Sequence, residues 1–75
     1  MTLDEYNQIQ NGMSYPQVVS IVGDTGLNTD DIPDFNGPEH PANVVSYLFF
    51  GQNSTAATVV FQDGVVIGKY QEGLI

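Results

Sequence analysis

The first apolar side chains of the chain recur at a spacing of three residues: Leu3, Tyr6 and Ile9. This spacing places side chains on one face of a helix. Thr2 and Glu5 have the spacing of a capping box, in which each side chain accepts a hydrogen bond from the backbone amide of the other residue. The pattern predicts a short helix over residues 2–11, ended by the Asn-Gly pair at its close.

A second helix is predicted directly after the first. Ser14 and Gln17 form another capping box, and Pro16 lies in the first turn, where its missing N–H removes no hydrogen bond. Gly23 supplies the left-handed conformation that is common at helix ends. The apolar positions between these signals share one face: Val18, Ile21 and Val22. The expected helix covers residues 14–22 and forms a helix-turn-helix hairpin with the first.

The last third of the chain is rich in β-branched and aromatic residues and predicts strands over residues 43–50, 56–62 and 65–72. Asp63-Gly64 separates the last two and is a favoured sequence for a two-residue hairpin turn. We therefore predict one α+β domain over residues 1–75. In it the helical hairpin packs on one face of a three- to four-stranded antiparallel β-sheet, in the chain order ααβββ.

Residues 24–42 separate the helices from the strands. They contain prolines, glycines and five acidic side chains and have no apolar period, which predicts a long loop. Loops of this length within a compact domain are uncommon and are often functional.

The predicted sheet is apolar on both faces. The hairpin turn pairs Gln62 with Val65, and alternation along the strands then sets the face of each side chain. The face away from the helices is expected to hold Val60, Ile67 and Lys69, and we group with it the apolar set of the first strand that includes Tyr47 and Phe49. A sheet with one face in water normally alternates apolar with polar residues, so this second face needs an explanation.

Three interpretations of the second apolar face remain open. Exposed apolar patches with aromatic side chains mark protein interfaces, which makes Tyr47, Phe49, Val60 and Ile67 the expected anchors for a partner protein. A second copy of the chain could cover the face in a homodimer. Alternatively, the loop over residues 24–42 folds across it and covers it with Ile32 and Phe35.

The charges of the chain exclude some partners. Nine side chains are acidic and one, Lys69, is basic, for a net charge of −8. Nucleic acids and anionic membranes are bound through Lys and Arg, so neither is expected, whereas a basic protein surface is favoured. No run of about 20 apolar residues predicts membrane insertion, and no signal peptide precedes the first helix cap.

The residues that carry catalysis or bind metals are sparse. The chain has no cysteine and one histidine, His40, so no zinc site is expected, and no nucleophile motif supports an enzyme. Calcium binds oxygen ligands in acidic loops, and this chain offers such ligands in Asp24, Asp30, Asp31 and Asp34, together with Asn28. The EF-hand spacing is absent, however. We expect no catalytic residue, no metal and no cofactor.

The two ends of the chain carry short segments in a characteristic order and spacing. At the start they are Thr2-Leu3, the segment 6–9, the Gly-Met-Ser turn at 12–14, and the Gln-Val and Ile-Val-Gly segments of the second helix. At the end they are Phe61-Gln62-Asp63-Gly64-Val65, followed by Gly68-Lys69, Gln71 and Leu74. With these segments the chain resembles a repeat of the secreted bacterial β-lactamase inhibitor proteins. A looser likeness, in the ααβββ plan alone, is to the small lipoprotein of the outer-membrane β-barrel assembly machinery.

The resemblance implies a non-catalytic protein-binding module, secreted or in the cell envelope, with an enzyme such as a β-lactamase as partner. In the family two repeats form a concave sheet surface, and a hairpin loop enters the enzyme's active site. The corresponding loop here is Gly51 to Thr55, which adds Gln52 and Asn53 to the expected partner-binding residues. The chain matches one repeat and lacks the family's disulfide. The alternative is a structural domain of a larger bacterial envelope or surface protein, whose sheet packs on a neighbour or on itself.

Overall fold

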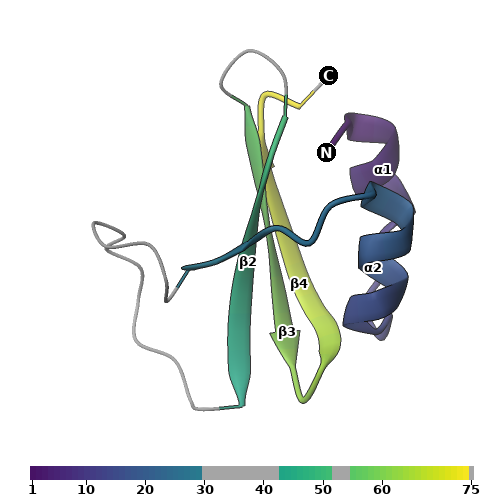
Figure 1. The fold of residues 1–75 in the computed structure, drawn as a ribbon, viewed down its shortest axis with the longest axis vertical. Helices are drawn as coiled ribbons and strands as arrows, with labels where there is room; N and C mark the ends of the chain where they lie inside the picture. Colours follow the sequence, from purple (N-terminus) through teal and green to yellow (C-terminus); the bar gives the residue numbers. More distant parts are fainter. Residues whose placement is uncertain (30–42, 52–54, 75) are drawn as a thin grey trace.

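The computed structural model describes residues 1–29, 43–51 and 55–74. Within them the chain forms two helices followed by four strands: α1 (Leu3–Gln8), α2 (Tyr15–Val22), β1 (Leu27–Asn28), β2 (Val44–Phe50), β3 (Ala56–Gln62) and β4 (Val65–Glu72). The strands form one antiparallel sheet in the order β1-β2-β3-β4, and both helices lie on one side of it (Figure 1). The predicted α+β fold is confirmed.

Both helices begin at the predicted capping boxes. The Thr2 hydroxyl accepts a hydrogen bond from the Glu5 amide at 3.2 Å, and the Glu5 carboxylate accepts one from the Thr2 amide at 2.7 Å. The same reciprocal pair joins Ser14 and Gln17 at the start of α2. At its other end α2 stops at Gly23, which has the left-handed φ of 77° that favours glycine.

Helix α1 is shorter than the sequence predicts, because it ends at Gln8 and the next residue, Ile9, is already extended. The connector to α2 turns away to pair with the first residues of β4. The Gly12 amide donates to the Val66 carbonyl and the Val66 amide donates to the Met13 carbonyl, each at 2.8 Å. The hydrogen bonds to β4 therefore replace a further turn of helix.

A short strand lies inside the segment that we predicted as an irregular loop. Leu27 and Asn28 pair with Leu48 and Tyr47 on β2. Just before this strand, Gly26 has a φ of 71°, and a Cβ built on it would lie 2.9 Å from Cε1 of Phe49. A glycine is required there both by the backbone conformation and by the close packing of the phenyl ring.

The hairpin between β3 and β4 has the predicted turn and the predicted first pairs. Asp63 and Gly64 have φ angles of 52° and 82°, as in the turn that Asp-Gly favours, and Gln62 pairs with Val65. Beyond Val66 the register shifts: Phe61 pairs with Val66, but Val60 pairs with Gly68, which leaves Ile67 as an extra residue in a β-bulge. The alternation of faces along β4 is therefore reversed after Ile67.

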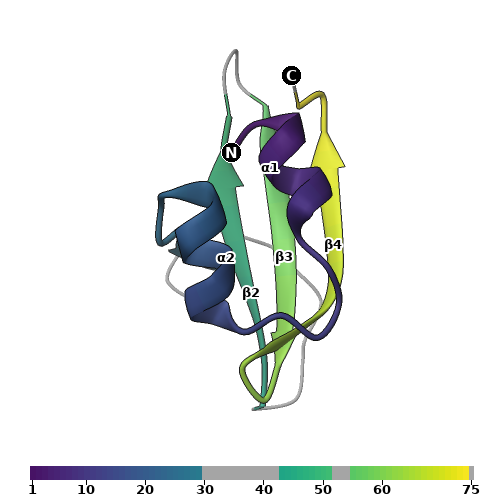
Figure 2. The ribbon, with the colours of Figure 1, turned by 90° about the vertical axis from the view of Figure 1, so that its right-hand side faces the viewer.

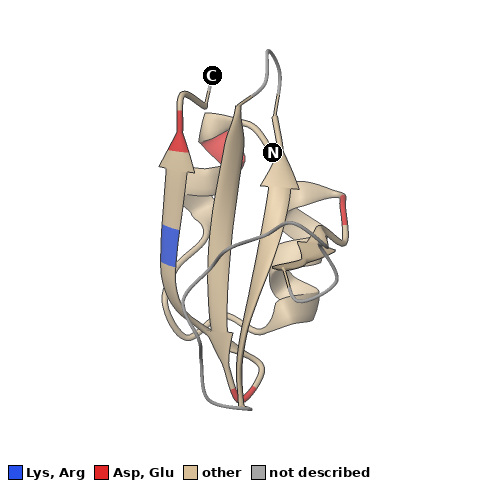
Figure 3. Cartoon of the chain, turned by 90° about the vertical axis from the view of Figure 1, so that its left-hand side faces the viewer, with Lys and Arg blue, Asp and Glu red and all other residues tan. Residues whose placement is uncertain are grey.

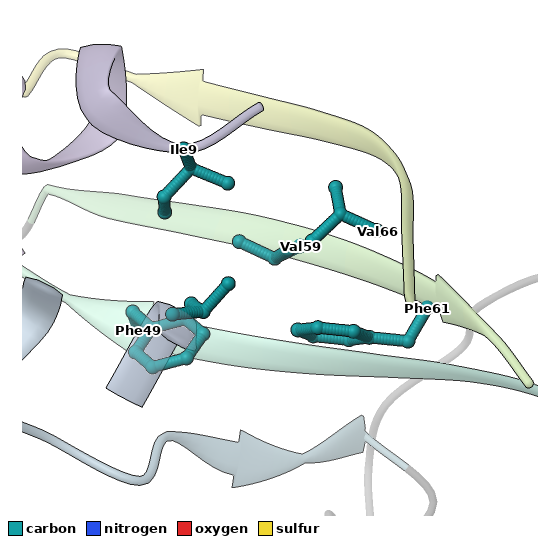
Figure 4. Packing of buried hydrophobic residues seen from close by; sticks show 6 residues of the cluster. Ile9, Phe49, Val59, Phe61 and Val66 are labelled. Atoms are coloured by element: carbon teal, nitrogen blue, oxygen red, sulfur yellow. The ribbon is translucent and has the colours of Figure 1, made fainter. Parts of the chain in front are cut away.

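The core lies between the helices and the sheet. It is a cluster of buried side chains from α2, from three strands and from the residue that follows α1: Ile9, Val18, Phe49, Val59, Phe61 and Val66. Figure 4 labels five of these side chains, which meet on the helix side of the strands: Ile9, Phe49, Val59, Phe61 and Val66. Viewed from the helix side, α2 lies in front of β2, and α1 lies in front of β3 and the near side of β4 (Figure 2). One face of the sheet is thus fully used by the helices.

Candidate protein-binding face

We call the side of the sheet away from the helices the open face. Because Phe49, Val59 and Phe61 point into the core, their neighbours along each strand point the other way. The registers then place two rows of side chains across the open face. One row crosses all four strands, Leu27–Leu48–Thr58–Tyr70, and the next crosses three, Ser46–Val60–Gly68.

Large apolar side chains are exposed on this side. Leu27 is 49% exposed, Phe50 is 57% exposed and Tyr70 is 68% exposed. Val65 and Ile67, at the beginning of β4, are also exposed, at 39% and 44%. Together with the half-buried Leu48 and Val60 they make a patch of the kind that marks interaction sites.

The open face carries almost no charge. Of the described strand residues that the registers place on it, only Glu72 at the end of β4 is charged. Figure 3, which views this face, shows acidic residues at turns and element ends around it. Interface cores are depleted of charge in the same way, so the face has the composition of a contact surface.

A match over nearly the whole chain accompanies this arrangement. The family model described as "Beta-lactamase inhibitor (BLIP)" matches residues 2–75. The chain belongs to the β-lactamase inhibitor family. Its members are inhibitors rather than catalysts, so the expectation of a protein-binding role holds at the level of the family. No curated protein matches the chain, and the looser likeness to the envelope lipoprotein has no support.

In this member of the β-lactamase inhibitor family, two residues that we predicted as anchors of the open face, Tyr47 and Phe49, lie on the helix side of the sheet instead. Phe49 is fully buried under the helices. Tyr47 packs in an aromatic cluster on the same side, with its ring centroid 4.7 Å from that of Tyr15 and 5.7 Å from that of Phe61. The alternation along β2 could not identify the inner set, because both sets are apolar. The pairing of Phe49 with Ala57 and of Tyr47 with Val59 decides it.

The prediction that Lys69 lies on the face away from the helices is also wrong. Its ammonium donates to the Tyr6 carbonyl at 2.8 Å and lies 4.3 Å from the centroid of the Tyr6 ring. The bulge at Ile67 turns Lys69 to the helix side and Tyr70 to the open face. The only lysine or arginine side chain of the chain is therefore bound at the C-terminal end of α1, and Tyr70, which sequence reasoning missed, takes its place on the open face.

Two other predicted partner-binding residues, Val60 and Ile67, lie away from the core. Val60 is half-buried on the open face, opposite Gly68, and Ile67 is exposed at the bulge beside it. Whether they bind a partner stays a prediction. The hairpin residues Gln52 and Asn53 lie outside the described residues, as do the expected covering side chains Ile32 and Phe35.

The polar groups of the described residues serve the fold. The Tyr15 hydroxyl donates to the Thr25 carbonyl at 2.6 Å, and the pKa of Tyr15 is raised, first by burial and then by Tyr47 and Asp24.

Among residues 1–29, 43–51 and 55–74, no three His, Asp or Glu side chains come together as a metal site. In the same residues no helix is long and apolar enough to cross a membrane. His40 and the acids at positions 30, 31 and 34 of the calcium hypothesis are not among the described residues.

Proposed function

We propose that this chain is a non-catalytic, inhibitor-type protein-binding module that presents the open face of its sheet to a partner protein. The observation that carries the proposal is the open face itself, which combines exposed Phe50, Tyr70 and Leu27 with a single charge at its border. Membership of an inhibitor family favours a protein as the occupant of such a surface.

The open face is suited to a contact by its rigidity and its chemistry. Its side chains stand on paired strands whose other side is packed against the helices, so their positions are set before binding. Phe50 and Tyr70 are aromatic residues of the kind that dominate binding energy, and Val60 lies on β3 in the row next to that of Tyr70. The partner would bury this apolar centre and leave the acidic residues at the rim.

The proposed partner is a β-lactamase, because the family is named for the inhibition of that enzyme. The hairpin that follows Phe50, with Gln52 and Asn53, would extend the contact toward the enzyme's active site, as the resemblance implies. Secretion or location in the cell envelope belongs to the same proposal.

Replacing Phe50 by Asp tests the face. We expect the chain to bind a purified class A β-lactamase in titration calorimetry and to slow the hydrolysis of a chromogenic substrate. Phe50→Asp should weaken binding about tenfold or more, because it introduces a charge into a desolvated contact. Val60→Ser should act in the same direction. Ser20→Asp, on the exposed side of α2, adds the same charge and should leave binding unchanged.

The alternative is a structural domain whose open face packs permanently on a neighbouring part of a larger protein, and the uncharged character of the face suits that role too. Substituting Tyr47 and Phe49 cannot separate the two, since Phe49 is in the core and Tyr47 packs against it, so their loss would destabilise either kind of domain. If the folded chain binds no β-lactamase, the inhibitor proposal fails. If binding persists in Phe50→Asp and Val60→Ser, the open face is not the contact.

A further inference from the structure

The outer edge of β4 is only partly covered. In the sheet order β1-β2-β3-β4 this strand is terminal. Its first residues pair with the connector between the helices, through Val66 and through a bridge between Val65 and Ser14. Within the described part of the chain, no backbone hydrogen bond reaches Gly68–Glu72 from outside β3. Figures 2 and 3 show no described element beside this half of the strand on its outer side.

This segment carries little of the usual protection of a sheet edge. Natural proteins prevent unwanted strand pairing with proline, with bulges, or with charged side chains that point outward or inward along the edge. The segment from Gly68 to Glu72 contains no proline, and the bulge at Ile67 lies before it. Its inward charge, Lys69, already has its partner in Tyr6 on the helix side, so an added strand would not leave that charge unpaired. The backbone of the segment can therefore accept another strand.

We propose that the strand it accepts is β4 of a second copy of this chain, antiparallel, with the two-fold axis at Tyr70. Two limits fix this register. The connector occupies the edge at Val66, and at the other end the strand stops at Glu72, before Gly73 with its φ of 72°. A two-fold axis at Tyr70 is the one that uses all of Gly68–Glu72 in both copies.

The side chains in this register are compatible. Opposed residues share a face in an antiparallel pair, so on the open face Tyr70 meets Tyr70 of the second copy and Gly68 meets Glu72. On the helix side Lys69 meets Gln71. An axis at Lys69 would oppose two lysines and run into the bulge, and one at Gln71 would pair only three residues of each strand. The register centred on Tyr70 therefore avoids opposed like charges, and a cross-strand tyrosine pair adds to it.

The dimer would join two sheets into one, with both open faces on the same side and all helices on the other. The edge is distinct from the proposed β-lactamase contact, except that Tyr70 lies on both. Because each copy has a net charge of −8, the copies repel at a distance, and added salt should strengthen the dimer rather than weaken it.

Sedimentation equilibrium of the unchanged chain over a hundredfold range of concentration decides whether it self-associates. We expect a monomer–dimer equilibrium that shifts toward the dimer as the salt concentration is raised. Tyr70→Glu places like charges on the axis and should raise the dissociation constant at least about tenfold, with an unchanged circular dichroism spectrum, since Tyr70 is 68% exposed. Phe50→Glu, an equal change on β2, should leave it unchanged.

Cross-linking then tests the register. The chain has no cysteine, and the two Tyr70 Cα atoms would lie about 4.5–5.5 Å apart, within the range that a disulfide spans. On mild oxidation, Tyr70→Cys should form a covalent dimer and Phe50→Cys should not. A monomer at every concentration and salt, or equal cross-linking of the two variants, overturns the proposal. Neither measurement involves a β-lactamase, so its failure is separate from failure of the proposed function.

Discussion

Single residues decide how closely the segment before β1 packs on the core. Gly26 combines a left-handed backbone with direct contact between its α-carbon region and the Phe49 ring, which is itself fully buried. A methyl group there has no room unless the ring or the strand moves. Gly12 has a similar backbone, with a φ of 93°, but a Cβ on it would meet nothing within 4 Å.

This pair of glycines gives a matched test. Gly12→Ala should lower the free energy of unfolding by about 1 kcal/mol, the cost of a left-handed alanine. Gly26→Ala should lower it by about 3 kcal/mol, because overpacking of the core adds to the same backbone cost. Urea denaturation followed by circular dichroism measures both. Equal losses in the two variants would mean that Phe49 moves aside at little cost.

At the scale of elements, α1 is held to the sheet by very few polar contacts. The Lys69 ammonium reaches across from β4 to the carbonyl of Tyr6 and the face of its ring. The last turn of a helix carries partial negative charge, so a cation there stabilises it. The single basic side chain of the chain thereby links the first helix to the last strand.

Lys69→Met should lower the free energy of unfolding by about 1–2 kcal/mol, because the methionine keeps the apolar stem but loses the charged hydrogen bond and the cation–π contact. Gln62→Met, at an exposed position of β3, is the comparison and should leave the free energy of unfolding nearly unchanged. Denaturant titration of both variants provides the measurement. Equal values for the two variants would show that the Lys69 contact is not stabilising.

The elements were largely predictable from sequence, and their faces were not. Capping boxes at Thr2 and Ser14 and the Asp-Gly turn are local signals, and the helix starts and the last hairpin follow them. The bulge at Ile67 has no local signal, yet it reverses the sides of Lys69 and Tyr70. Strand β1 was missed because two residues, Leu27 and Asn28, are too few to show a period.

The candidate site was predicted only in part for the same reason. The excess of apolar side chains predicted a second apolar face, and exposed Leu27, Phe50 and Tyr70 lie on it. The anchors on that face depend on which set of β2 residues points inward, and this is set by the pairing of β2 with β3. Val60 is on the open face as expected, whereas Tyr47 is half-buried and packs against the core on the helix side.

For the molecule as a whole, Tyr15 makes the free energy of unfolding depend on pH in the alkaline range. Burial raises its pKa above the ordinary 10.0, and Tyr47 and Asp24 act in the same direction. The folded chain thus binds the hydroxyl proton of Tyr15 more tightly than the unfolded chain does. The contribution of this proton to the free energy of unfolding is complete below pH about 10 and is lost as the pH rises through the pKa of the folded state.

We expect the free energy of unfolding to fall as the pH rises above about 10, and to fall less steeply in Tyr15→Phe, which has no proton to lose there. Urea titrations at a series of pH values give these slopes. A Tyr15→Phe variant with the full slope would assign the alkaline loss to other groups.

The hydrogen bonds between the helix connector and Val66 also bear on the order in which the chain can fold. Gly12 and Met13 find their backbone partner more than fifty residues later in the sequence. Two helices of six and eight residues are too short to persist alone in water. The β3–β4 hairpin, by contrast, closes over a two-residue turn and needs no distant segment. During synthesis on the ribosome the helical hairpin would therefore remain unformed until the final strands had emerged, and the beginning of the chain would be the last part to become structured.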